Sequence, residues 1–351
     1  MRNSAYSYEM PESAKEYDVS FTFKNLRLFP IVANQSFVAE HEDIGKFLLL
    51  DDAIRDKKIV ISETGAIDRS ESEQNQDPEG LSNTSDEDRN EINQQRTFQS
   101  NMGGGVSGTV NTLIAKNTST DTIFIMAGEV VKGGKQDRVI AKDVIIAPNE
   151  QIDLSAFCVE KNRWTTKEQN KGQFTGYFNV SSMDIRKAVT EQKSQNEVWE
   201  KVDEHTAKNK ATSGTSTYTN LENSGEYQAE LKAYMTKFKG AFSKHENVIG
   251  FVAVTADRVI GCDLFATHDL FVDAYDNLVH SYIGHAITKG EEISITNEKV
   301  YAYLDEILKS EEGQEETIED NGTLYKWKNK NKQLPTSQQT EQLHQGRQIV
   351  C

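Results

Sequence analysis

Cysteine is scarce in this 351-residue sequence: it occurs three times, at positions 158, 262 and 351, and no two cysteines form a CxxC pair. This number and spacing argue against a disulfide framework and against a zinc knuckle, because both need several paired cysteines. Cys158 and Cys262 lie in apolar runs that read as strands. We therefore expect both to be buried core residues and not nucleophiles.

Metal-binding and catalytic spacings are also missing. The seven histidines are dispersed, and His280 and His285 are five residues apart, so they do not share a helix face. Neither HExxH nor the GxSxG serine motif occurs. We therefore predict no metal site and no cofactor, and the sequence identifies no catalytic residue.

The sequence has no long hydrophobic run and no excess of positive charge. No apolar stretch approaches the length that spans a bilayer, and residues 1–18 have no apolar core of the kind found in signal peptides. The formal net charge is −16, which repels polyanions at long range. We expect a cytoplasmic protein whose partners include neither nucleic acid nor a membrane, and a local basic pocket stays open.

Two segments are poor in apolar residues. Residues 68–100 are dominated by Asp, Glu, Asn, Gln and Ser, and such a segment cannot bury enough surface to offset its ordering entropy. We predict a mobile acidic insertion there and a mobile linker at residues 205–220. We divide the chain into a β-rich part, 1–180, and an α+β part, 181–351, and expect the two to form one integrated unit.

The densest strand signals lie between Ile123 and Trp164. The β-branched runs, bounded by Gly133-Gly134 and Pro148-Asn149, predict a three-strand meander over residues 122–127, 138–146 and 151–159. In a meander, the end of the third strand lies at the same sheet edge as the turn between the first two. Two polar segments that are distant in sequence should therefore meet at this edge.

The second part of the chain alternates helices with a hairpin. Apolar spacing predicts helices over 181–204 and 225–244, which form a helical hairpin, then a β-hairpin over 248–265 and helices over 267–283 and 297–309. The fold class is therefore α+β: a β-rich N-terminal sheet or sandwich, with the helical hairpin and the C-terminal β-hairpin and helix packed against it.

The sheet edge is the best candidate for a binding site. Its glycines allow close backbone approach, its basic groups suit a small anion such as the phosphate of a nucleoside, and an indole offers a stacking face. Carboxylates there suit ribose hydroxyls or general-base roles. The candidate ligand-binding residues are Glu129, Lys132, Gly133, Gly134, Lys135, Gln136, Asp137, Arg138, Glu160, Arg163, Trp164, Gln195 and Trp199.

A plainer interpretation of the same residues stays open. The glycines then form an ordinary hairpin turn, the charges neutralise one another in salt bridges, and the indole packs on the core. Gln195 lies on the apolar stripe of the first long helix, where it either hydrogen-bonds a strand end or lines the pocket.

The sequence AGEVVKGGKQDRVIAKDVIIAP, followed by FCVEKNRW, resembles the family named after its association with ADP-ribosylglycohydrolases and the rhodanese-phosphatase superfamily. The later segments QNEVW and IGFVAVTADRVIGCDLF also resemble it. The similarity covers roughly residues 19–283, while the acidic insertion and the Gln-rich tail depart from the family. The resemblance implies a role near NAD and ADP-ribose metabolism, through genomic association.

These observations leave three functions open. The first is a binding protein for a small anion or a nucleotide-like, phosphorylated metabolite of NAD and ADP-ribose metabolism, with or without catalysis. The second is a non-catalytic scaffold or interaction protein for a partner enzyme of that metabolism. The third is a hydrolase for a different phosphorylated substrate.

Overall fold

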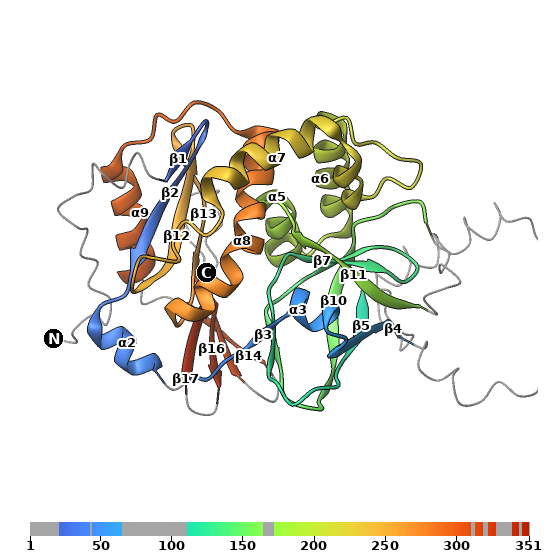
Figure 1. Cartoon of the computed structure of the whole chain (residues 1–351), viewed down its shortest axis with the longest axis horizontal. Coiled ribbons are helices and arrows are strands. Elements are labelled where there is room, and N and C mark those ends of the chain that lie inside the picture. The colour runs from blue at the N-terminus through green and yellow to red at the C-terminus, as the bar shows by residue number, and fades with distance from the viewer. Residues whose placement is uncertain are drawn as a thin grey trace, which may run out of the picture.

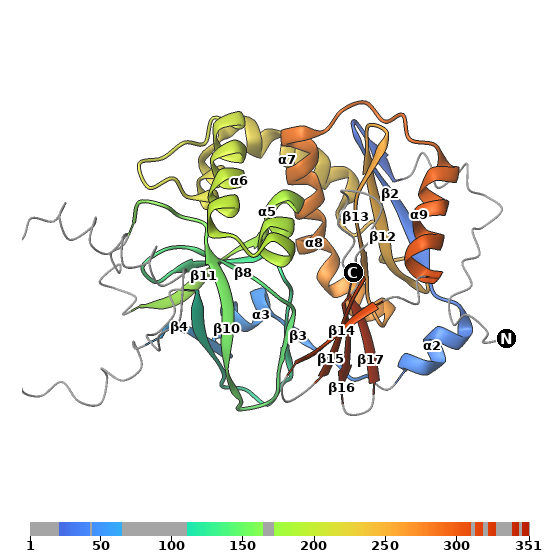
Figure 2. The same cartoon turned by 180° about the vertical axis from the view of Figure 1, so that it is seen from behind.

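The computed structural model describes residues 21–42, 44–64, 111–163 and 172–309, and the backbone of four short strands between residues 313 and 350. Figures 1 and 2 show the chain from opposite sides. The predicted mobile insertion at 68–100, Trp164 and Cys351 lie outside the described residues. Helices and strands are both abundant, which confirms the α+β class.

Six strands of the first part close into a barrel in the order β10-β5-β4-β11-β7-β8. Alternate residues of each strand point inward, so Ile61, Ile140 and Ala156 share one buried apolar cluster. The barrel interior is therefore filled by side chains. Its strands are β4 (Ile59–Glu63), β5 (Thr112–Asn117), β7 (Glu129–Gly133), β8 (Arg138–Ile140), β10 (Gln151–Cys158) and β11 (Gln173–Val180).

The predicted meander is present in part: its second strand is broken into β8 and β9, and a further strand, β7, follows the first strand, β6, where the turn was predicted. Gly128, with a φ of 93°, separates β6 from β7, and residues 141–143 separate β8 from β9. β6 and β9 pair with each other in a second, three-stranded sheet with β3. Glu129 is consequently a strand residue and not part of the turn. The bounds are β3 (Leu48–Leu49), β6 (Ile123–Ile125) and β9 (Val144–Ile146), and α3 (Leu50–Arg55) follows β3.

Helices cover one side of the barrel, where Val130, Val139 and Val159 pack against Val198 and Val202. The predicted single helix over 181–204 is interrupted. It consists of α5 (Met183–Lys187), a π-helical turn η2 (Ala188–Gln192) and α6 (Gln195–Lys208). The next two helices are the 3₁₀ helix η3 (Tyr218–Asn223) and α7 (Gly225–Phe238).

The interruption has a local cause. Lys193 adopts a left-handed conformation, with a φ of 49°, and the Ser194 hydroxyl then accepts a hydrogen bond from the Glu197 amide as the cap of α6. Residues 205–220, the predicted linker, include the end of α6 and the start of η3, and Tyr218 is buried. The mobility of this stretch stays a prediction.

The predicted β-hairpin and the two helices after it are present. The hairpin, β12 and β13, joins the N-terminal strands in a four-stranded sheet ordered β1-β2-β12-β13. Because β2 precedes residue 180 and β12 follows it, this pairing favours one integrated unit. The elements are β1 (Thr22–Phe23), β2 (Leu26–Val32), α2 (Gln35–His41), β12 (Val248–Thr255), β13 (Arg258–Leu264), α8 (His268–Lys289) and α9 (Asn297–Lys309).

Alternation along β12 places its two faces in two different cores. Phe251 and Ala253 pack with α8, while Val252 and Val254 pack with α9 and α2. Both views show α8 between this sheet and the helices above the barrel (Figures 1 and 2). The remaining strands form hairpins β14 (Gly313–Ile318) with β15 (Gly322–Trp327) and β16 (Gln339–Leu343) with β17 (Gly346–Val350).

Among the helices that the structure describes, none combines the length and the apolar character needed to cross a membrane.

Candidate functional site

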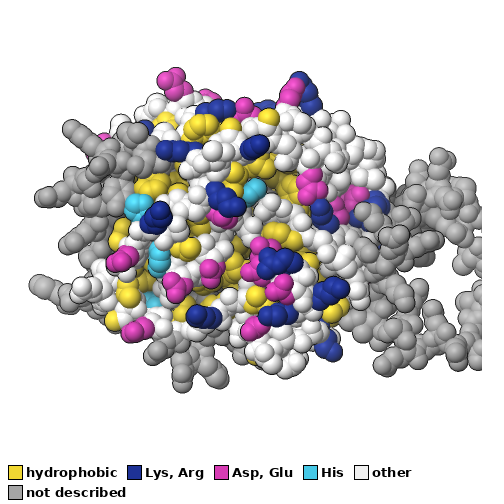
Figure 3. All heavy atoms as spheres, viewed as in Figure 1, with side chains coloured by type: hydrophobic (Ala, Val, Ile, Leu, Met, Phe, Trp, Pro, Cys, Tyr) yellow, Lys and Arg dark blue, Asp and Glu magenta, His cyan; other side chains and the backbone are white. Residues whose placement is uncertain are grey.

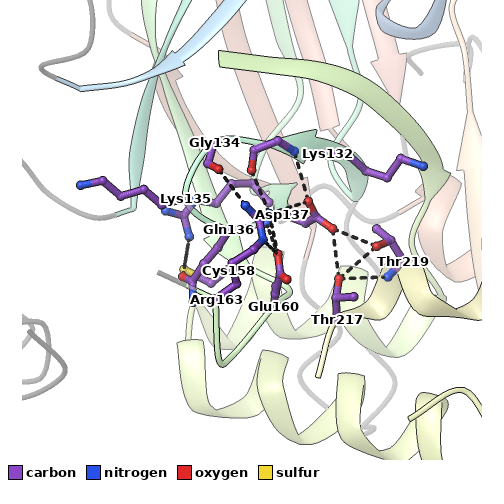
Figure 4. Close-up of polar contacts among 12 residues, drawn as sticks. Lys132, Gly134, Lys135, Gln136, Asp137, Cys158, Glu160, Arg163, Thr217 and Thr219 are labelled. Atoms are coloured by element: carbon purple, nitrogen blue, oxygen red, sulfur yellow. Dashed lines mark hydrogen bonds and ion pairs between the residues drawn. The ribbon is translucent and has the colours of Figure 1, made fainter. Parts of the chain in front are cut away.

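The two polar segments predicted to meet do lie side by side at one end of the barrel. Cys158 near the end of β10 pairs with Arg138 at the start of β8, and residues 134–137 form the turn between β7 and β8. The side chains that follow β10 therefore face this turn (Figure 4). We call this group the barrel-end cluster: Glu63, Gly133, Gly134, Gln136, Asp137, Arg138, Cys158, Glu160 and Arg163.

Arg163 connects the two segments. Its Nε donates to Oε2 of Glu160 at 2.8 Å, and its Nη1 and Nη2 donate to the carbonyl oxygens of Gly134 and Gly133 at 2.8 and 3.1 Å. Nη2 also lies 3.2 Å from Oδ1 of Asp137. The side chain is only 11% exposed, so these are well-shielded, charge-assisted contacts. The planar guanidinium thus holds the turn against the end of β10.

Asp137 is buried and accepts hydrogen bonds from three directions. Its Oδ1 accepts from the Gly133 amide at 3.1 Å. Its Oδ2 accepts from the hydroxyls of Thr217 and Thr219 at 3.1 and 2.8 Å. The Asp137 amide in turn donates to Oε2 of Glu160 at 3.1 Å. The turn is therefore tied to the start of η3, which sequence spacing did not indicate.

The glycine pair is required by close packing. Gly133 has a φ of 142°, and a Cβ there would lie 2.5 Å from the carbonyl oxygen of Gln173. Gly134 has a φ of 49°, and a Cβ there would lie 2.4 Å from the ring of Phe174. Both amides donate within the protein, to Asp137 and to the Gln173 carbonyl.

Arg138 points into the end of the barrel and is completely buried. Its Nη1 contacts two neutral groups, Oε1 of Gln136 at 3.3 Å and the Cys158 sulfur. Its Nη2 reaches Oε1 of Glu63 at 3.4 Å, and Nε has no hydrogen-bond partner among the described residues. Burial raises the pKa of the Cys158 thiol, and the neighbouring guanidinium opposes this rise. The expectation of a buried cysteine is confirmed.

Helix α6 contributes two of the predicted residues. The Gln195 amide accepts from the Cys158 backbone N–H and donates to its carbonyl, both at 2.8 Å, so it holds the end of β10. Trp199 lies one turn further on, with Nζ of Lys161 5.8 Å from its ring centre. The Trp199 Nε1 is buried and has no acceptor among the described residues.

Three predicted residues point away from the cluster. Figure 4 shows the side chains of Lys132 and Lys135 extending in opposite directions, and Nζ of Lys132 pairs with Glu222 at 2.9 Å. Glu129 lies at the other end of β7, in the buried pair described next. Trp164 is outside the described residues.

Glu129 is a buried carboxyl group at the beginning of β7. Its Oε1 accepts from the Tyr177 hydroxyl at 2.9 Å and its Oε2 from the Met126 amide at 2.7 Å. Burial, only partly opposed by these hydrogen bonds, raises its pKa to about 8. The group is therefore largely protonated at neutral pH.

A family model for the ARG and rhodanese-phosphatase-superfamily-associated protein domain matches residues 15–350. The chain belongs to this family. The resemblance carried by the GGKQDR turn and the FCVEKNRW segment is thus confirmed, and it extends to both ends of the described fold. No curated protein and no solved structure matches the chain.

Within the described ranges, no group of three or more His, Cys, Asp or Glu residues is placed to hold a metal ion. Sequence reasoning missed Glu63, Thr217 and Thr219 because each is remote in sequence from the turn that it contacts. Two guanidinium groups, those of Arg138 and Arg163, lie at the barrel end, and Arg138 is the more deeply buried of the two.

Proposed function

We propose that this chain binds a small phosphorylated, nucleotide-like metabolite at the barrel end, in the context of NAD and ADP-ribose metabolism. The observation that carries the proposal is the environment of Arg138. Its guanidinium is completely buried, yet its contacts are two neutral groups and one carboxylate at 3.4 Å.

A buried guanidinium is costly unless close acceptors compensate its charge. Arg163, in the same cluster, meets this condition with carboxylate and carbonyl oxygens at 2.7 to 3.2 Å. Arg138 lacks such close acceptors, and its Nε donates no hydrogen bond among the described residues. A phosphate oxygen at Nε and Nη2 would supply the two parallel hydrogen bonds for which a guanidinium is suited.

The net charge of −16 and the mixed surface charge favour a small anion over a polymer. On the face shown in Figure 3, Lys and Arg side chains are interspersed with Asp and Glu side chains. Such a surface attracts a polyanion weakly, whereas a buried guanidinium acts at short range in a medium of low dielectric constant. The family name adds the ADP-ribose context.

The test is titration calorimetry and thermal unfolding with ADP-ribose, AMP and inorganic phosphate. Arg138→Lys keeps the charge and removes the two-pronged donor, so we expect at least tenfold weaker binding. Lys132→Ala is the matched control, because it removes a positive charge from β7, next to the turn, where the side chain pairs with Glu222. The proposal fails if none of the three compounds binds, or if both variants lose affinity equally. Release of products from ADP-ribose would distinguish an enzyme from a binder.

A scaffold role is the second candidate, favoured by the closed network around Arg163. Its guanidinium, Glu160 and Asp137 bond mainly to one another and to the turn, as a purely structural cluster would. This role predicts that the chain forms a complex with a purified ADP-ribosylglycohydrolase in the absence of nucleotide. Co-elution in size-exclusion chromatography would support it, and separate elution at micromolar concentrations would refute it.

A further inference from the structure

Glu63 is the last residue of β4 and brings a negative charge to the barrel end. Its Oε1 accepts from the Lys135 backbone amide at 3.1 Å and lies 3.4 Å from Nη2 of Arg138. The side chain is 13% exposed, so it lies between the buried guanidinium and the surface. A backbone amide and a guanidinium that converge on one oxygen are the donors that bind phosphate in proteins.

The backbone leaves room for this oxygen. A Cβ on Gly134 would lie 2.8 Å from Oε1 of Glu63, closer than such atoms approach, so any side chain there would displace the carboxylate. Gly134 supplies the left-handed turn, and the absence of a Cβ leaves room both for the Phe174 ring and for this oxygen. The Glu63 carboxylate thus fills the space between the Lys135 amide and the Arg138 guanidinium.

We infer that the Glu63 carboxylate occupies the position of the ligand's anionic group and is displaced when the ligand binds. This inference rests on the proposed function and adds the residue that sets its affinity and specificity. The carboxylate is a weak occupant, because its contact with Arg138 is long and uses one of the two parallel donors. A phosphate group that bonds to Nε and Nη2 together makes the better contact and replaces it.

Displacement has a measurable consequence. When an internal group competes for the site, the apparent affinity is the intrinsic affinity multiplied by the fraction of molecules in which the site is open. Its negative charge also repels an incoming phosphate over a few ångströms. Removing the charge of Glu63 should therefore tighten the binding of small anions, whereas removing a residue that touches the ligand favourably would weaken it.

The experiment compares wild type with Glu63→Gln and Glu63→Ala by titration with inorganic phosphate and with ADP-ribose. Glu63→Gln is nearly isosteric and can still accept from the Lys135 amide, so it serves if the alanine variant does not fold. Glu222→Ala is the matched control, since it removes a carboxylate that pairs with Lys132 of β7, close to the turn, and that makes no hydrogen bond or ion pair with Arg138 within the described structure. We expect the Glu63 variants to bind both anions at least tenfold more tightly than wild type, and Glu222→Ala to bind within about twofold of it.

The outcomes separate this inference from the proposed function. If wild type binds and the Glu63 variants bind equally or more weakly, Glu63 does not compete with the ligand, while the proposed function stands. If neither wild type nor the Glu63 variants bind phosphate or ADP-ribose, both ideas fail. Equal tightening in Glu222→Ala would mark a general charge effect and would overturn the inference.

Discussion

Replacing Glu129 by Gln should flatten the dependence of stability on pH. Burial raises the pKa of this carboxyl group to about 8, against 4.5 for an exposed glutamate. Between these values the folded chain keeps a proton that the unfolded chain releases. The protonated Glu129 therefore contributes fully to the free energy of unfolding below pH 4.5. This contribution falls as the pH rises from 4.5 to about 8, and above about pH 8 it does not change further.

The magnitude follows from the pKa difference. Each pH unit in this window corresponds to about 1.4 kcal/mol, so wild type should lose roughly 2 to 3 kcal/mol of unfolding free energy between about pH 6 and pH 8. Glutamine has the shape of the protonated acid, and its amide can accept from the Met126 N–H and donate to the Tyr177 oxygen. The variant should therefore fold, and this part of its pH dependence should disappear.

Urea unfolding of both proteins at a series of pH values measures the effect. Glu200→Gln is the matched control, because that side chain is 68% exposed and lies on helix α6. Its pH dependence should follow that of wild type. Parallel curves for wild type and Glu129→Gln would show that Glu129 titrates as an exposed group, and would refute the reasoning.

Three further substitutions test the packing described above, each by urea unfolding. Gly134→Ala should destabilise the protein by about 1 to 3 kcal/mol, because it places a side chain at a positive φ against an aromatic ring, whereas Gly214→Ala, with open space around its Cβ, should stay within about 0.5 kcal/mol. Asp263→Asn leaves the buried Arg186 charge without its carboxylate partner at 2.7 Å and should lower the free energy of unfolding by about 3 to 5 kcal/mol. A loss below about 1 kcal/mol would contradict a buried ion pair. Gln195→Ala removes two hydrogen bonds to the backbone of β10 and should lower the free energy of unfolding by about 1 to 3 kcal/mol. An unchanged free energy of unfolding would contradict this prediction and would mean that water replaces the amide.

Local signals in the sequence determined much of the fold. β-branched runs bounded by glycine and proline located strands of the meander, and two apolar runs on either side of a short turn located β12 and β13. Thr267 is the N-cap of α8, as its residue type predicts, because capping depends on the first turn alone. The last helix, α9, begins at the predicted residue, Asn297. The break before α6 was missed, although Ser194 and Glu197 have the spacing of a capping box.

The meander also predicted which segments meet at the barrel end. Strand order along a meander fixes which ends are adjacent, so the turn at residues 134–137 and the segment after β10 could be placed together from sequence. Their local spacing gave no indication of which charges compensate one another. Arg163 and Arg138 look alike in sequence, yet one is fully paired and the other is not.

Long-range pairing was decided only by the tertiary structure. Closing the barrel brings Glu63 beside Arg138, 75 residues away, and folding η3 onto the turn brings Thr217 and Thr219 to Asp137. The same holds for β2 and β12, which join the two parts of the chain in one sheet. Periodicity reports which face of an element is buried, but it carries no information about the element that buries it, because that choice depends on packing between distant segments.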